Sequence, residues 1–172
     1  TVTIVVQEVG KTSRMIGTLE VGQGVLDFVG PLGQAAELPE SGNVVCIGGG
    51  FGVAPIYPKA KAMYQRGGVK VTSIIGARRA DLVILEEELG AVSHRLLVAT
   101  EDGSKGDKGL VTDVLKKLIE AEEKIDEVIA IGPMVMMRAV SETTRPYGIR
   151  TMISADPIMV DGTGMCGACR MT

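Results

Sequence analysis

The pattern of hydrophobic and polar positions changes near residue 40. Before that point, short β-branched runs such as Thr1–Glu8 and Val25–Val29 alternate with glycine-containing turns, which is typical of β-strands. A sheet built from about 40 residues is too small to be stable alone, so we expect further sequence before Thr1. The polar stretch 37–42 is the expected boundary between this part and the next.

After residue 42, short apolar runs alternate with longer segments whose apolar residues recur every three to four positions. The pattern predicts five strands alternating with four helices, and hence an α/β fold: a five-stranded parallel sheet with helices on both faces. The predicted strands are 44–47, 69–75, 95–99, 127–131 and 150–154, and the predicted helices are 53–66, 81–89 (capped by Asp81), 110–122 and 133–144. Ligands of such sheets bind at the carboxyl ends of the strands.

Three glycine-bearing stretches follow predicted strands. The stretch Gly48–Pro55 opens the first helix, where glycines allow a phosphate-bearing ligand to approach the backbone at the helix N-terminus. It is not the G-x-G-x-x-G dinucleotide fingerprint, and an ordinary strand-to-helix turn is the alternative. Because 100–106 and 132–136 end two further strands, all three should meet at one edge of the sheet, which favours a nucleotide site.

Two arginines, Arg78 and Arg79, follow the second predicted strand, where an adenosine ribose could be recognised. An arginine there can bind a 2′-phosphate, and a solvated pair of charges is the alternative. These residues leave both NAD and NADP open.

The end of the chain carries the spacing Asp161-x4-Cys166-x2-Cys169. It is the plant-type iron–sulfur spacing with the first thiolate replaced by a carboxylate. A cluster needs four ligands, so either the fourth lies beyond residue 172 or this is not a cluster site. A redox-active thiol pair, half a zinc site, and a turn aspartate at Asp161 are the alternatives.

Composition narrows the function classes. The chain of 172 residues is 45% hydrophobic with a net charge of −3 and no basic cluster, so a nucleic-acid partner is not expected. No apolar run reaches the length of a membrane span. The single His94 argues against a catalytic triad, and Cys46 lies in an apolar run as a packed side chain. Three cysteines are too few for a disulfide scaffold, so reduced thiols and a cytoplasmic location are expected.

In their order and spacing, the stretches Gly48–Pro55, Thr100–Gly103 and Gly132–Met137 and the terminal Asp161–Arg170 resemble the ferredoxin–NADP reductase superfamily. Within it, the chain is most similar to the small subunit of NADH-dependent reduced ferredoxin:NADP oxidoreductase and the related sulfide dehydrogenase small subunit. The electron-transfer subunit of dihydroorotate dehydrogenase B is a second relative, which carries a cysteine where this chain has Asp161. The resemblance covers essentially the whole chain.

The resemblance implies three parts: the trailing part of an FAD-binding β-barrel over 1–40, an NAD(P)-binding domain over 41–155, and the start of a [2Fe–2S] segment over 156–172. It implies the cofactors FAD, NAD(P)H, with NAD favoured, and a [2Fe–2S] cluster. The partner would be a larger iron–sulfur flavoprotein subunit in a heterodimer. Because the cofactors carry the chemistry, no catalytic side chain is expected. The alternative of another class is a nucleotide-binding module with a structural zinc site.

The resemblance also assigns site residues, and the flavin motif itself would lie upstream of Thr1. The implied flavin contacts are Ile4, Val5, Val6, Lys11 and Thr12; the implied nucleotide contacts are Gly49, Gly50, Gly52, Val53, Ala54, Thr100, Asp102, Gly103, Gly132, Pro133 and Met136; the implied cluster ligands are Asp161, Cys166 and Cys169.

Overall fold

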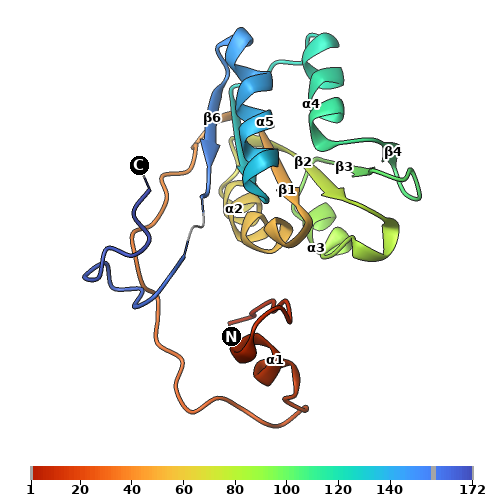
Figure 1. Ribbon diagram of the computed structural model, residues 1–172. Coiled ribbons are helices and arrows are strands. Elements are labelled where there is room, and N and C mark those ends of the chain that lie inside the picture. The colour runs from red at the N-terminus through yellow and green to blue at the C-terminus, as the bar shows by residue number, and fades with distance from the viewer. Residues whose placement is uncertain (1, 156–157, 172) are drawn as a thin grey trace. The chain divides into compact units, whose positions relative to one another are not determined.

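A computed structural model describes residues 2–155 and 158–171 of the chain (Figure 1). The described residues form two compact units. The larger unit is continuous in sequence, Glu37–Ala155, and the smaller one combines the segment up to Ala36 with the segment from residue 158 onward. In the described residues, no helix is long and apolar enough to cross a membrane.

The larger unit is built on a six-stranded sheet in which every neighbouring pair of strands is parallel. The strand order across the sheet is β4-β3-β2-β1-β5-β6. The strands are β1 (Gly42–Gly49), β2 (Val69–Ala77), β3 (Arg95–Thr100), β4 (Asp107–Lys108), β5 (Glu127–Ile131) and β6 (Arg150–Ile153). The central strands β1 and β5 are apolar and almost wholly buried, as expected of a parallel sheet covered on both faces.

Helices cover both faces of this sheet (Figure 1). One face packs against α2 (Val53–Arg66) and α3 (Glu86–Ala91), with Ile56, Met63 and Leu89 fully buried between the layers. The other packs against α4 (Val111–Glu120) and α5 (Met134–Thr144). Three short 3-10 turns complete the unit: η1 (Gly50–Gly52), η2 (Ala80–Leu82) and η3 (Arg145–Tyr147).

The predicted fold class is confirmed, with one additional strand. The predicted order of five strands and four helices is present, and the boundaries of α2 are those predicted. The sixth strand, β4, pairs two residues with the end of β3, Ala99 with Asp107 and Thr100 with Lys108. A two-residue strand has no apolar periodicity, so the hydrophobic pattern could not indicate it.

The helix predicted over 81–89 is wrong at its first half. Residues Ala80–Leu82 form a 3-10 turn, and α3 begins only at Glu86. Between them, Val83, Ile84 and Leu85 are partly buried against the hydrophobic core, with Leu85 in the left-handed conformation (φ 53°). Burial of these three apolar residues outweighs their helical pattern, and Asp81 pairs with Arg79 instead of capping a helix.

The short strands predicted over residues 1–40 are not formed in the described part of that range. Residues 2–9 have no regular structure, and Lys11–Gly17 forms a helix, α1. Ser13 Oγ accepts hydrogen bonds from the backbone N–H groups of Val9 (3.1 Å) and Gly10 (2.9 Å) at its start. A strand needs a neighbour for its backbone groups, and the described residues of the smaller unit provide none.

The order of the strands creates a switch point in the sheet. From the central β1 the chain passes outward through β2 and β3 to β4, then returns to the other side of β1 with β5 and β6. The loops after β1 and β5 are therefore neighbours at the carboxyl edge, and they lead to helices on opposite faces of the sheet, α2 and α5; an open α/β sheet has its ligand crevice at such a divergence.

Candidate functional site

The backbones of the loops after β1 and β5 lie in close contact at the switch point. A side chain at residue 52 would overlap the carbonyl group of Ile131 and lie 2.8 Å from Cα of Gly132. A Cβ at Gly132 would lie 3.1 Å from the carbonyl oxygen of Gly49 and 2.8 Å from Cε of Met136. Glycine at residues 49, 52 and 132 is thus required by the approach of one loop to the other. The structure brings these predicted nucleotide-binding residues together.

The glycine between them serves a different purpose. Gly50 has a left-handed backbone (φ 52°), and a Cβ built there would meet no atom within 4 Å. The space beside it is open, and it borders the N-terminus of α2. The backbone N–H groups of a first helical turn have no partners within their helix, so they can receive a phosphate group.

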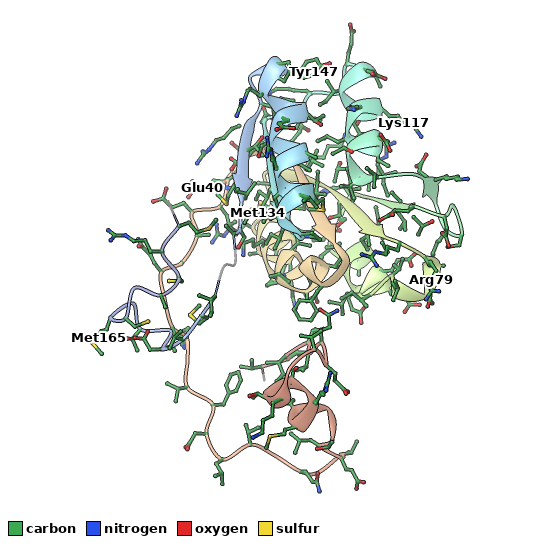
Figure 2. All side chains as sticks on the ribbon, viewed as in Figure 1. Glu40, Arg79, Lys117, Met134, Tyr147 and Met165 are labelled. Carbon is green, nitrogen blue, oxygen red and sulfur yellow. The ribbon has the colours of Figure 1, made fainter. Side chains whose placement is uncertain are left out.

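The neighbouring predicted residues take distinct places. Val53 is fully buried in the core, so it could contact a nucleotide through its backbone alone, whereas Ala54 is half-buried. Pro133 precedes α5, and its carbonyl oxygen accepts the N–H of Met136 (2.9 Å). The side chain of Met136 packs against Gly49, and Met134 lies exposed at the start of the helix (Figure 2).

The third predicted stretch forms a tightly bonded loop after β3. The buried Thr100 hydroxyl donates to the Lys105 carbonyl oxygen (2.8 Å) and accepts the Lys105 N–H (3.0 Å), which closes the loop. Asp102 Oδ1 accepts both the N–H (2.9 Å) and the hydroxyl (2.6 Å) of Ser104. The Ser104 hydroxyl, followed by its backbone N–H, lowers the pKa of Asp102 below its usual range. Gly103 has a positive φ of 77°, which the turn requires.

Ser104 was missed by sequence reasoning, although it ties two loops together. Its hydroxyl oxygen accepts the backbone N–H of Ala80 (2.8 Å), so the loop after β3 is held to the loop after β2. The signal that could have found it is the serine two residues after an aspartate, a spacing at which the carboxylate bonds the following backbone.

The two arginines after β2 differ in their surroundings. Both are exposed, and Figure 2 shows Arg79 on the loop that follows β2. Arg79 Nη2 donates to Asp81 Oδ2 at 2.9 Å, and both side chains are more than half exposed. The pair lies on the loop that Ser104 holds.

A separate hollow of about 440 Å³ lies along the outer edge of β3. Glu86 and Lys105, which form an ion pair, are both among the residues that line it. Its lining residues are Glu86, Leu96, Leu97, Val98, Lys105, Gly106 and Asp107. This hollow is beside the switch-point crevice rather than within it, because β2 lies between β3 and β1.

The three predicted cluster ligands lie on one exposed loop of the smaller unit. Asp161 Oδ1 accepts the N–H of Thr163 (2.8 Å), and Oδ2 accepts the N–H of Cys166 (3.0 Å). These backbone bonds, with the one from Thr163 the strongest, hold the pKa of Asp161 below its usual range. The N–H of Ala168 points at Cys166 Sγ (3.5 Å).

This loop carries suitable donor atoms for a cluster, but they do not surround a common point. One carboxylate and two free thiols at these spacings suit an iron–sulfur cluster in their chemistry. Within the residues that the structure describes, however, no three His, Cys, Asp or Glu side chains come together around a common point. The assignment of Asp161, Cys166 and Cys169 as ligands stays a prediction.

The predicted flavin contacts also lie in the smaller unit. Ile4, Val5 and Val6 belong to its extended first segment, and Lys11 and Thr12 are the first two residues of α1. Ile4, Lys11 and Thr12 are exposed. Their role in holding FAD stays a prediction.

Comparison with known proteins identifies the larger unit. A family model described as the oxidoreductase NAD-binding domain matches residues 46–142, which include the second half of β1, all of β5 and the loops that follow both strands. The chain belongs to this family. The NAD-binding character predicted for this unit is thus confirmed, and the residues assigned to the nucleotide stay a prediction.

Similarity to individual members of this NAD-binding family extends over nearly the whole chain. A Thermotoga maritima protein, described as a homologue of the electron transfer subunit of dihydroorotate dehydrogenase B (NAD(+)), is 46% identical over 169 residues, covering 98% of this chain and 59% of the relative. The Bacillus caldolyticus electron transfer subunit of dihydroorotate dehydrogenase B is 38% identical over 173 residues, covering 97% and 63% respectively.

A solved structure agrees with this assignment. The structure of NADH-dependent reduced ferredoxin–NADP oxidoreductase, studied for flavin-based electron bifurcation, matches with a TM-score of 0.86 and 45% identity. The match covers 96% of this chain and 59% of that one. The resemblance predicted from the motifs is confirmed, and the chain spans about 60% of the length of these relatives.

Proposed function

We propose that this chain is the nucleotide-binding part of an electron-transfer oxidoreductase subunit, and that it binds NAD(P)H in the crevice between the loops after β1 and β5. The observation that carries the proposal is the contact of Gly52 with Ile131 and Gly132, which leaves the open space beside Gly50 next to a helix N-terminus. A dinucleotide pyrophosphate fits such a place in shape and in charge.

The remaining parts of the proposal concern the cofactors that the resemblance to the ferredoxin–NADP reductase superfamily implies. FAD would exchange hydride with the nicotinamide and single electrons with a [2Fe–2S] cluster. Ile4–Val6, Lys11 and Thr12 would contribute to holding FAD, and Asp161, Cys166 and Cys169 would supply three cluster ligands. The chain's own residues bind and orient; none is assigned a proton to transfer.

The proposed partner is a larger iron–sulfur flavoprotein subunit. The similarity to NADH-dependent reduced ferredoxin–NADP oxidoreductase supports this choice. A second candidate function for this chain is that of the electron-transfer subunit of dihydroorotate dehydrogenase B. The names of the curated relatives favour it. The two share the nucleotide site and differ in the partner, so co-purification of the partner distinguishes them.

Nucleotide binding is tested with the whole chain by calorimetric titration with NADH. We expect saturable binding by the unaltered chain and strongly weakened binding by Gly50→Ala, because the new Cβ projects into the open space beside the helix N-terminus. Gly148→Ala is the matched control: residue 148 is also left-handed (φ 63°) with no atom within 4 Å of a built Cβ, and it follows η3, away from the loops after β1 and β5. Unchanged binding by Gly50→Ala would refute the assigned site.

The cluster is tested by anaerobic incubation with iron and sulfide, followed by visible spectroscopy. A brown chain whose spectrum shifts in Asp161→Cys supports ligation by Asp161, since a thiolate replaces a carboxylate. A colourless chain that takes up zinc through Cys166 and Cys169 would instead support the zinc-module alternative.

A further inference from the structure

Three methionines at the start of α5 lie in three different environments. Met134 is exposed (Figure 2), Met136 is half-buried, and Met137 is buried in the core. The thioether of a methionine is oxidised by hydroperoxides to a polar sulfoxide. Because the three side chains differ in exposure and in their neighbours, oxidation of each should differ in rate and in its effect on the molecule.

The sulfur of Met136 occupies space that the glycines of two loops leave free. A Cβ built at Gly49 would overlap Met136 Sδ. A Cβ built at Gly132 would lie 3.1 Å from the same sulfur and 3.1 Å from the carbonyl oxygen of Gly49, so the sulfur and this oxygen border one small space. The thioether therefore lies in contact with the loops after both β1 and β5, at the edge of the proposed nucleotide site.

An oxygen atom added to this sulfur would disturb the contact between the loops. The side chain already touches the backbone of both, and one further heavy atom in a close-packed contact forces its neighbours to move. The polar atom that borders the same space is the carbonyl oxygen of Gly49, which is an acceptor like the sulfoxide oxygen, so the two oxygens would repel each other. A sulfoxide at Met136 would thus push the two loops apart, whereas one at the exposed Met134 would project into solvent.

We infer that Met136 is a site of oxidative modification, at which a hydroperoxide converts the thioether to a sulfoxide that parts the loops after β1 and β5 and weakens nucleotide binding. A lone pair of the sulfur attacks one peroxide oxygen, and the S–O bond forms as the O–O bond breaks. The sulfur loses two electrons, and the second oxygen leaves as hydroxide and takes up the proton released by the first, which gives water. The effect on binding rests on the proposed nucleotide site; the modification and the loosening of the loops do not.

The modification is tested by treating the whole chain with hydrogen peroxide for increasing times and mapping the sulfoxides by peptide mass spectrometry. We expect Met134 to react first, Met136 next, and the buried Met137 only when the chain is denatured. A Met137 that reacts as fast as Met136 would show that the reagent acts on unfolded chains, and would overturn the inference. A Met136 that stays unmodified in the native chain would overturn it as well.

The consequence is tested by calorimetric titration with NADH before and after peroxide treatment. The affinity of the unaltered chain should fall by about tenfold or more. Met136→Leu removes the sulfur at nearly constant volume, so its affinity should be the same before and after treatment. This variant keeps Cys166 and Cys169 and thus also controls for oxidation of the exposed thiols. Met134→Leu is the matched control and should lose affinity on treatment as the unaltered chain does; an equal loss in Met136→Leu would overturn the inference.

Urea denaturation gives a second readout that does not depend on a nucleotide. The chain oxidised at Met136 should unfold at a lower urea concentration than the untreated chain, and treatment should not shift the midpoint of Met136→Leu. If the untreated chain binds no NADH and this shift still appears, the proposed function fails while the modification and its effect on the loops stand. An unshifted midpoint in a chain oxidised at Met136 would overturn the inference and leave the proposed function standing.

Discussion

The Cα of Gly52 faces the carbonyl group of Ile131 so closely that no side chain fits between them. Residue 52 ends the turn after β1, and residue 131 ends β5, so this contact joins the two strands on either side of the switch point. The proposed nucleotide site is thus bordered by two backbone segments whose approach requires glycine at residue 52.

Gly52→Ala is expected to damage both stability and binding. The methyl group must displace the β5 loop, and overpacking of this kind costs about 1–3 kcal/mol. A fall in the free energy of unfolding, measured by urea denaturation, should accompany loss of NADH binding. Gly24→Ala, where a methyl group meets no neighbour, should change neither quantity, and a native-like Gly52→Ala would contradict the packing described.

Thr100→Val is expected to loosen the loop after β3. The substitution keeps the shape of the buried side chain and leaves the Lys105 N–H and carbonyl oxygen without their partner, at a cost of about 1–2 kcal/mol. Thr72→Val in β2 is the matched control, because no hydrogen bond from its hydroxyl is present among the described residues. Faster amide exchange confined to 101–106 in Thr100→Val, by hydrogen-exchange mass spectrometry, is the expected signature.

The ion pair between Arg150 and Glu127 should stabilise the fold more than its long N–O distance of 3.6 Å suggests. Glu127 is 5% exposed, and its Oε1 has no hydrogen-bond partner in the described structure, so Arg150 Nη1, 3.6 Å from Oε2, is its nearby counter-charge. Arg150→Met should cost about 1–3 kcal/mol by leaving a buried carboxylate unpaired. Arg138→Met breaks the exposed pair with Glu142 and should cost under about 0.5 kcal/mol. Equal costs in thermal unfolding would show that burial does not govern the pair.

The three cysteines should separate into two reactivity classes. Burial raises the pKa of Cys46 to about 12, whereas Cys166 and Cys169 are free and exposed. Because the thiolate is the reacting species, a disulfide reagent at pH 8 should modify two thiols quickly in the native, metal-free chain and the third only after denaturation. Cys46→Ser should leave the fast phase intact; three fast thiols in the native chain would contradict the burial of Cys46.

The pKa of Asp102 should depend on Ser104. With its pKa lowered in the folded state, this carboxyl group favours folding above its ordinary value of 3.8, and that contribution is lost as the pH falls through the folded value. Ser104→Ala should move the titration midpoint of Asp102 upward, as followed by carboxyl NMR. Asp126, whose pKa is lowered chiefly by the backbone N–H of Asn43, should titrate unchanged. An unmoved Asp102 would show that other groups set its pKa.

The parts of the fold that the sequence predicts are those with a strong periodic pattern. The boundaries of α2 follow from Val53, Ile56, Ala60 and Met63, all fully buried, and the alternation of strands and helices predicts the parallel sheet. The missed features depend on contacts between distant residues. Leu85 is not helical and packs against the hydrophobic core, and β4 is formed by pairing with the end of β3.

The candidate site divides in the same way. The glycines after β1 and β5 could be placed at one edge from the strand order, because parallel strands end on the same side. The sequence could not predict two other contacts, the pairing of Arg79 with Asp81 and the hydrogen bond from Ala80 to Ser104. Such contacts depend on the geometry of the loops, which a hydrophobic pattern does not determine.

The position of β1 between β2 and β5 has a consequence for how the chain folds. Asn43 in β1 donates its N–H to Asp126, just before β5 and 83 residues later in the chain. The residues that pair between β1 and β2 are only about a third as far apart in sequence. Closing a long loop costs entropy before the strand pair that it joins can be stabilised. We therefore expect β1 and β2 to associate early and β5 to join them late. During synthesis on the ribosome, the loop after β1 would therefore lack its neighbour until Ile131 and Gly132 have been added. Until then, the proposed nucleotide site would be incomplete.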